Sequence, residues 1–167
     1  MRAVLVATTV FLGVVLSLVG SIKVAGGRIA PSIYGMQLEA IGERYQPALA
    51  GVVIFSETLA TLLKELPTRQ FMLLIGLPEL SCGVIFLASL TINSMRPVAH
   101  FTNQLMLLHM FGPLTSHVLG DDWSLPLDSN VGPTGIVPAL IVTLLLAVRL
   151  VASTRMIAER KASTKQS

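Results

Sequence analysis

Apolar residues in this chain occur in long blocks, and this feature limits the folds that are open to it. A run of roughly 18 or more apolar residues with few charges is typical of a membrane-spanning helix, because ~20 residues at ~1.5 Å each cover ~30 Å of hydrocarbon. We therefore predict an all-α integral membrane protein, a four-helix bundle with a long, partly helical first loop. The single domain covers residues 1–152, with spans at about 3–22, 71–92, 98–119 and 135–151, and residues 153–167 form a basic tail.

The first block has an alternative interpretation as a cleaved signal peptide. Its apolar stretch, residues 3–22, is longer than the usual core of a signal peptide, and no clear Ala-x-Ala cleavage site follows it. We therefore expect this block to be retained as a helix, although the sequence alone leaves cleavage open.

The connection between the first two spans, residues 24–69, is unusually long. Two glycines and Pro31 are expected to break the helix, and residues 32–45 predict a short amphipathic helix. Residues 48–63 are apolar but too few for a full span, so we expect an interfacial or re-entrant helix there. A fifth crossing by this segment is the alternative.

Charge distribution suggests an orientation. Lys and Arg in short flanking segments favour the cytosol. The C-terminal tail is basic, the short turn at 93–97 contains Arg96, and the loop before the fourth span has three Asp and no Lys or Arg. Five basic residues, Lys23 and four in the long first loop, oppose this assignment, but long loops follow the rule less strictly. We predict that both termini are cytosolic.

Ionisable residues inside the apolar blocks need partners, because an unpaired charge in hydrocarbon is costly. Glu79 falls near the middle of the second span, and His109 falls at a similar depth in the third. Neighbouring spans would let these two side chains meet, either as a proton-linked or polar-substrate site or as a buried clasp that fixes helix packing. We favour the clasp, since hydrogen bonds between membrane helices often serve packing.

Small residues accompany Glu79 on one helical face. Gly76 and Gly83 lie three residues before and four residues after it, so all three share that face. Small residues allow a second helix to approach closely. The sequence leaves open whether that helix belongs to this chain or to another protein.

Further charged positions lie near the predicted ends of the spans. Lys23, His117 and Asp121 fall at the luminal boundary, where each is explained by anchoring and where together they could form a salt-bridged cluster. Arg149 falls near the cytosolic end of the fourth span, and we expect it to extend to lipid phosphates.

Composition argues against several functions. The 12 Lys and Arg against 9 Asp and Glu form no basic patch with interleaved aromatic residues, so no nucleic-acid partner is expected. Cys82 is the only cysteine, which excludes an intrachain disulfide. The sequence has no Gly-rich phosphate loop, no His-Glu-x-x-His motif and no set of four metal ligands. Its three His share one segment, which disfavours haem. We therefore expect that the protein is not an enzyme and that it binds neither a metal nor a cofactor.

Four short motifs, in this order and at these positions, resemble the novel acetylcholine receptor chaperone family, a branch of the DoxX-like four-helix membrane proteins. They are Gly20-Ser21-Ile22-Lys23, Glu79-Leu80-Ser81-Cys82-Gly83, His117-Val118-Leu119-Gly120-Asp121 and Arg149-Leu150. The resemblance covers essentially all the hydrophobic chain.

This resemblance implies an endoplasmic reticulum membrane protein that assists the assembly of nicotinic acetylcholine receptor subunits without joining the mature receptor. Its partners would be membrane lipid and the transmembrane helices of receptor subunits. One alternative is a DoxX-like redox or transport component that uses Glu79 and His109, and another is a scaffold in a larger complex. The sequence leaves a homo-oligomer open.

Overall fold

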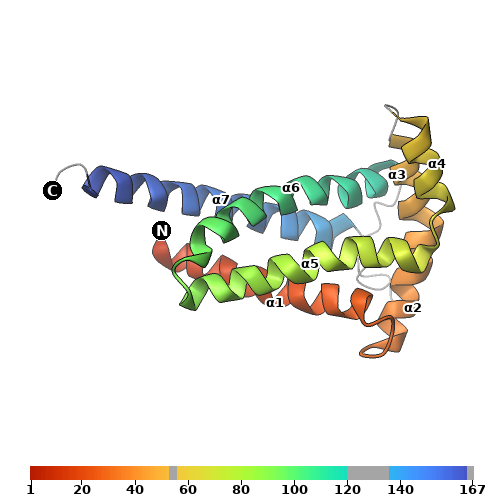
Figure 1. Cartoon of the computed structure of the whole chain (residues 1–167), viewed down its shortest axis with the longest axis horizontal. Coiled ribbons are helices and arrows are strands. Elements are labelled where there is room, and N and C mark those ends of the chain that lie inside the picture. Colours follow the sequence, from red (N-terminus) through yellow and green to blue (C-terminus); the bar gives the residue numbers. More distant parts are fainter. Residues whose placement is uncertain (53–55, 120–135, 165–167) are drawn as a thin grey trace.

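The computed structural model describes residues 1–52, 56–119 and 136–164, and every described element is a helix (Figure 1). Four helices are long, and four short ones follow the first of them. In chain order they are α1 (Arg2–Val24), α2 (Pro31–Ala40), the π-helix η1 (Ile41–Tyr45), α3 (Gln46–Val52), α4 (Glu57–Glu65), α5 (Thr68–Thr91), α6 (Met95–Leu119) and α7 (Ile136–Thr164).

Three of the described helices, α1, α5 and α7, are long and apolar enough to cross a membrane. The prediction of an all-helical membrane protein is confirmed to this extent. Helix α6 has 25 residues, which is sufficient length, but it is not one of the three. Polar residues such as His100, Asn103 and His109 interrupt its apolar sequence.

Helices α1 and α5 pack against each other in antiparallel directions, and glycine sets their separation. A methyl group added at Gly20 would lie 2.8 Å from the carbonyl oxygen of Gly76. One added at Gly83 would lie 2.8 Å from the carbonyl oxygen of Gly13. Two glycines on each helix therefore bring the backbones into direct contact, as small residues do between membrane helices.

A hydrophobic core joins these two helices to α6 and α7. Its fully or nearly fully buried members come from all four long helices: Leu12, Leu16, Cys82, Phe86, Ala99, Met106, Met110 and Leu146. The two methionines come from α6, where flexible thioether side chains can fill irregular space between helices. Large apolar residues on the outer sides of the long helices remain exposed, as expected for surfaces that meet lipid.

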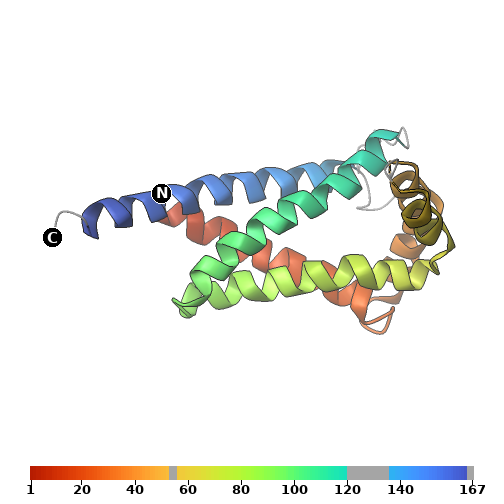
Figure 2. The ribbon, with the colours of Figure 1, turned by 45° about the horizontal axis from the view of Figure 1, so that its top comes forward.

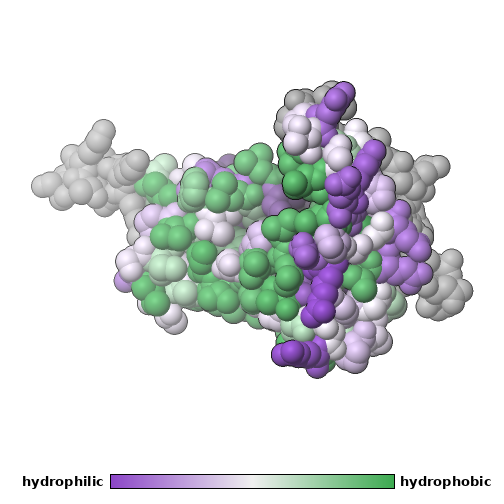
Figure 3. Space-filling view, turned by 45° about the vertical axis from the view of Figure 1, so that its right-hand side comes forward, coloured by the Kyte–Doolittle hydropathy of each residue, from purple (hydrophilic) through white to green (hydrophobic). Residues whose placement is uncertain are grey.

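The short helices lie across one end of the long ones (Figure 1). A second apolar cluster of Ile41, Phe71 and Met72 holds them to α5. Gln46 also donates hydrogen bonds from Nε2 to the carbonyl oxygens of Leu63 and Leu66, at 2.7 and 2.5 Å. Hydrophilic side chains gather in a band over this end, whereas the sides of the long helices are hydrophobic (Figure 3). This distribution fits a layer at a membrane surface.

The segment 48–63 is divided between α3 and α4, which have seven and nine residues. Neither helix is long enough to cross a bilayer, which agrees with an interfacial position rather than a fifth span. The chain enters this layer through Gly26 and Gly27, whose φ angles are +62° and +84°, and Pro31 begins α2. Glycine adopts such positive φ angles readily, so the predicted break is present.

The opposite end of the bundle brings together the N-terminus, the turn between α5 and α6, and the C-terminal part of α7 (Figure 2). Helix α7 does not end near residue 151, where the predicted span ends, but continues to Thr164. Part of the predicted tail is therefore a continuation of the helix.

Candidate functional site

A buried ion pair joins α1 to α5. The Nζ atom of Lys23, in the last turn of α1, donates hydrogen bonds of 2.6 Å to both carboxylate oxygens of Glu79. Lys23 is 8% exposed and Glu79 is 7% exposed. Hydrogen bonds to both carboxylate oxygens offset much of the cost of removing two charges from water. The geometry is that of a clasp between two helices.

The partner that the structure gives to Glu79 is therefore Lys23, whereas the sequence predicted His109. Among the described residues no hydrogen bond joins Glu79 to His109, and Nε2 of His109 is buried without a hydrogen-bond partner. The prediction compared depths on neighbouring spans and did not consider α1. The glycine contact brings α1 close enough for the long Lys23 side chain to reach Glu79.

The glycines that share a face with Glu79 explain how this happens. A methyl group at Gly76 would lie 2.6 Å from Cβ of Lys23, so only glycine leaves room for the lysine side chain to pass. Gly83, two turns beyond Gly76 on α5, lies against the backbone of Gly13 and Ser17. The face formed by Gly76, Glu79 and Gly83 is therefore filled by a helix of this same chain.

Arg149 forms a second polar centre inside the bundle, and the expectation that it extends to lipid phosphates is wrong. It is 3% exposed. Its Nε donates to Oγ1 of Thr9 at 3.0 Å, and its Nη1 donates to Oδ1 of Asn103 and to the carbonyl oxygen of Ala99, both at 3.2 Å. Hydrogen-bond acceptors on α1 and α6 thus hold the guanidinium in the interior.

Two further contacts complete this centre. The guanidinium carbon of Arg149 lies 3.9 Å from the ring centroid of Phe86, a cation–π arrangement. Asn103 also donates from Nδ2 to the carbonyl oxygen of Leu146 at 3.0 Å. All four long helices therefore meet at Arg149.

Sequence reasoning missed Thr9, Phe86 and Asn103 as members of this centre. Asn103 is completely buried within α6, and an amide side chain within a mainly apolar block was the available signal for it. Thr9 and Phe86 carry no such signal, because threonine and phenylalanine are common in membrane helices.

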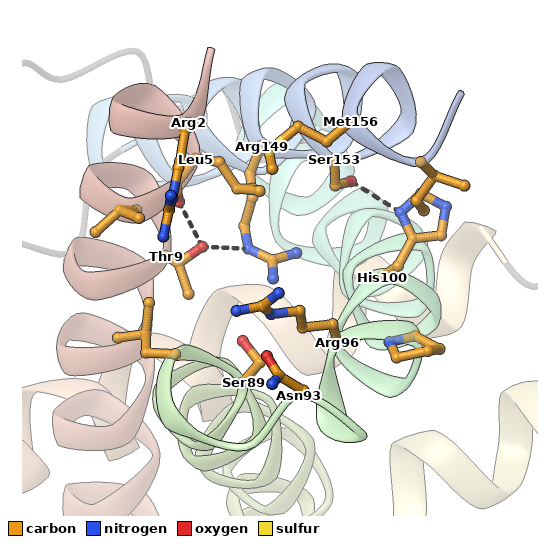
Figure 4. Close-up of a pocket in the computed structure, with 14 residues that line it drawn as sticks. Arg2, Leu5, Thr9, Ser89, Asn93, Arg96, His100, Arg149, Ser153 and Met156 are labelled. Atoms are coloured by element: carbon orange, nitrogen blue, oxygen red, sulfur yellow. Dashed lines mark hydrogen bonds between the residues drawn. The ribbon is translucent and has the colours of Figure 1, made fainter. Parts of the chain in front are cut away.

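A cavity of about 600 Å³ lies beside Arg149, at the end of the bundle opposite the short helices. Arg2, Arg96 and Arg149 point into it from α1, α6 and α7 (Figure 4). His100 also lines the cavity, and its Nδ1 lies 2.8 Å from Oγ of Ser153. Sequence reasoning used Arg96 only to infer orientation and did not anticipate this cavity.

Two predicted site residues, His117 and Asp121, lie partly or wholly outside the described part of the chain. His117 belongs to α6, but its side chain lies outside the described part of the chain, as does all of Asp121. The predicted luminal cluster of Lys23, His117 and Asp121 therefore stays a prediction, except that Lys23 is already paired with Glu79.

Comparisons of this chain with models of known protein families, with curated proteins and with solved structures found no match.

Proposed function

We propose that this chain is a non-enzymatic membrane protein of the endoplasmic reticulum that promotes the assembly of nicotinic acetylcholine receptor subunits through contacts between transmembrane helices. The proposal includes a four-span topology, with α6 as the additional crossing and both termini in the cytosol. It follows from the motif resemblance, and the structure bears on it through the positions of the motif residues.

The observation that supports it best is where the matching residues lie. Among the positions that match the motifs, Lys23, Glu79, Gly83 and Arg149 are all buried where long helices meet. Residues that determine a four-helix arrangement are the ones that a fold resemblance should share. The chemistry also suits a chaperone, because both buried polar centres are engaged in joining helices.

The outer surface of the long helices is where a client helix would bind. Helix α1 fills the glycine face, so a client helix has access only to the outer sides of the long helices. Along α6, Phe101, Leu105, Leu108 and Phe111 are 50–71% exposed on one side of the helix. In the proposed mechanism such apolar sides shelter a subunit helix until it meets its neighbours in the receptor.

Co-expression tests this function. Nicotinic subunits are expressed with and without the chain, and surface receptor is measured by binding of a labelled antagonist to intact cells. An unrelated pentameric channel serves as the control for general effects on secretion. We expect several-fold more surface nicotinic receptor and no change in the control. An unchanged signal across several nicotinic subunit types, with the chain present and folded, would refute the proposal.

A further inference from the structure

The cavity beside Arg149 concentrates positive charge in an unusual way. Guanidinium groups from three different helices, those of Arg2, Arg96 and Arg149, point into one space (Figure 4). No Asp or Glu occurs among the described residues that line it. Like charges that share a space repel one another, and each gains if an anion is placed between them.

The sequence explains why the chain itself does not readily supply this anion. Residues 1–38, 80–119 and 136–158 contain no Asp or Glu. These ranges include all of α1 and α6, the turn between α5 and α6, and most of α7. Among the described residues Arg2 and Arg96 form no salt bridge.

Arg149 is held with one edge available. Its Nε and Nη1 donate to Thr9, Ala99 and Asn103, whereas no bond from Nη2 to any described residue is present. The protein thereby fixes the guanidinium plane and leaves one nitrogen free to donate. Arg2 and Arg96 are exposed at the mouth of the same cavity. One donor held in the interior and two donors on exposed side chains suit a tetrahedral oxyanion such as a phosphate ester.

The size and walls of the cavity indicate more than a bare ion. Its volume of about 600 Å³ falls within the ~300–1,000 Å³ typical of sites for small organic ligands. Apolar side chains, including Leu5, Leu90 and Ile157, form part of the wall. A ligand that matches both features has a phosphate at one end and a hydrocarbon part at the other.

We propose that this cavity binds the headgroup of an anionic phospholipid, with its phosphate held by Arg2, Arg96 and Arg149. The orientation proposed above places the site at the cytosolic surface, where anionic lipids attract basic residues. This site goes beyond the receptor-assembly function, and only its cytosolic placement rests on the topology proposed with that function. A soluble phosphate ester shares the same chemistry, so the experiment must separate the two sources.

Thermal unfolding of the full chain in detergent provides the test. Cys82 is the only cysteine and is 1% exposed, so its labelling by a fluorogenic maleimide reports unfolding. The probes are phosphatidic acid, phosphatidylcholine, glycerol phosphate and inorganic phosphate. We expect phosphatidic acid to raise Tm by several degrees in a saturable manner, and the other three to have little effect.

Variants assign the effect to the cavity. Arg96→Gln and Arg2→Gln each remove one guanidinium that contributes no described hydrogen bond to the fold, and each should weaken phosphatidic acid binding about tenfold. Arg155→Gln removes the same charge from an exposed position on α7 outside the cavity and should leave binding unchanged. Equal losses in all three variants, or an equal shift with phosphatidylcholine, would overturn the site. Equal shifts with the soluble phosphates would overturn the lipid as its ligand.

Discussion

The Nζ atom of Lys23 lies 2.6 Å from each carboxylate oxygen of Glu79, so a single buried salt bridge connects the end of α1 to the middle of α5. Lys23 is 8% exposed and Glu79 is 7% exposed, so at least 92% of the surface of each residue is buried. Removing one member of such a pair leaves the other charge without a partner in a medium that solvates it poorly. The pair therefore makes the relative position of these two helices sensitive to single substitutions.

Lys23→Met keeps a side chain of similar length and leaves Glu79 unpaired. We expect the free energy of unfolding in mild detergent to fall by about 3–5 kcal/mol, as found when one partner of a buried ion pair is removed. Denaturant titration measures this change. The double variant Lys23→Met with Glu79→Met should recover most of the loss, because no unpaired charge stays buried. A Lys23→Met variant as stable as the wild type would show that the pair does not form.

Gly20→Ala places a methyl group 2.8 Å from the carbonyl oxygen of Gly76 and forces α1 and α5 apart. We expect a loss of about 1–3 kcal/mol in the free energy of unfolding, the usual cost of overpacking. Gly35→Ala is the matched control, because nothing lies within 4 Å of the added methyl in α2. There the change should stabilise the protein slightly, by up to ~1 kcal/mol, since alanine favours the helix. Effects of the same sign at both positions would contradict the close approach of α1 and α5.

Arg149→Lys retains the charge but cannot reproduce the donors that Arg149 directs to Thr9, Ala99 and Asn103. We expect a loss of about 2–3 kcal/mol, because buried acceptors lose a charged donor. Arg155→Lys, on the exposed side of the same helix, should change stability by less than ~0.5 kcal/mol. Thermal unfolding of both variants under the same conditions compares the two losses of stability. Equal stabilities would mean that Arg149 is not held in the interior.

The proposed topology can be tested with inserted glycosylation acceptors. If α6 crosses the membrane, an Asn-x-Thr acceptor inserted after residue 94 faces the cytosol and stays unmodified, whereas one inserted after residue 128 faces the lumen and gains a glycan. A gel shift that is reversed by glycosidase measures the modification. The same outcome at both sites would mean that α6 does not cross, and a glycan only after residue 94 would invert the orientation.

Much of the fold could be predicted from the sequence because hydrophobic block length directly determines where long helices form. The blocks at 3–22 and 71–92 correspond to α1 and α5, and the polar interruptions in 24–69 correspond to the short helices. The shared face of Gly76, Glu79 and Gly83 was also predictable, since it follows from helical periodicity alone.

The partners of the charged residues could not be predicted in the same way. The register between α1 and α5 depends on which glycines meet, and this brings Lys23 rather than His109 to Glu79. Position along a helix indicates depth but does not indicate which neighbour a side chain faces. For the same reason Arg149 was expected at the lipid surface, whereas Thr9 and Asn103 hold it inside.

Helix α7 continues to Thr164, well beyond the other long helices at that end of the bundle (Figure 1). A helix that runs from residue 151 to Thr164 is about 20 Å long at ~1.5 Å per residue. This segment displaces the end of α7 from the other long helices by that length, so a label at its C-terminal end would report on the surroundings of α7 and not on the packed helices.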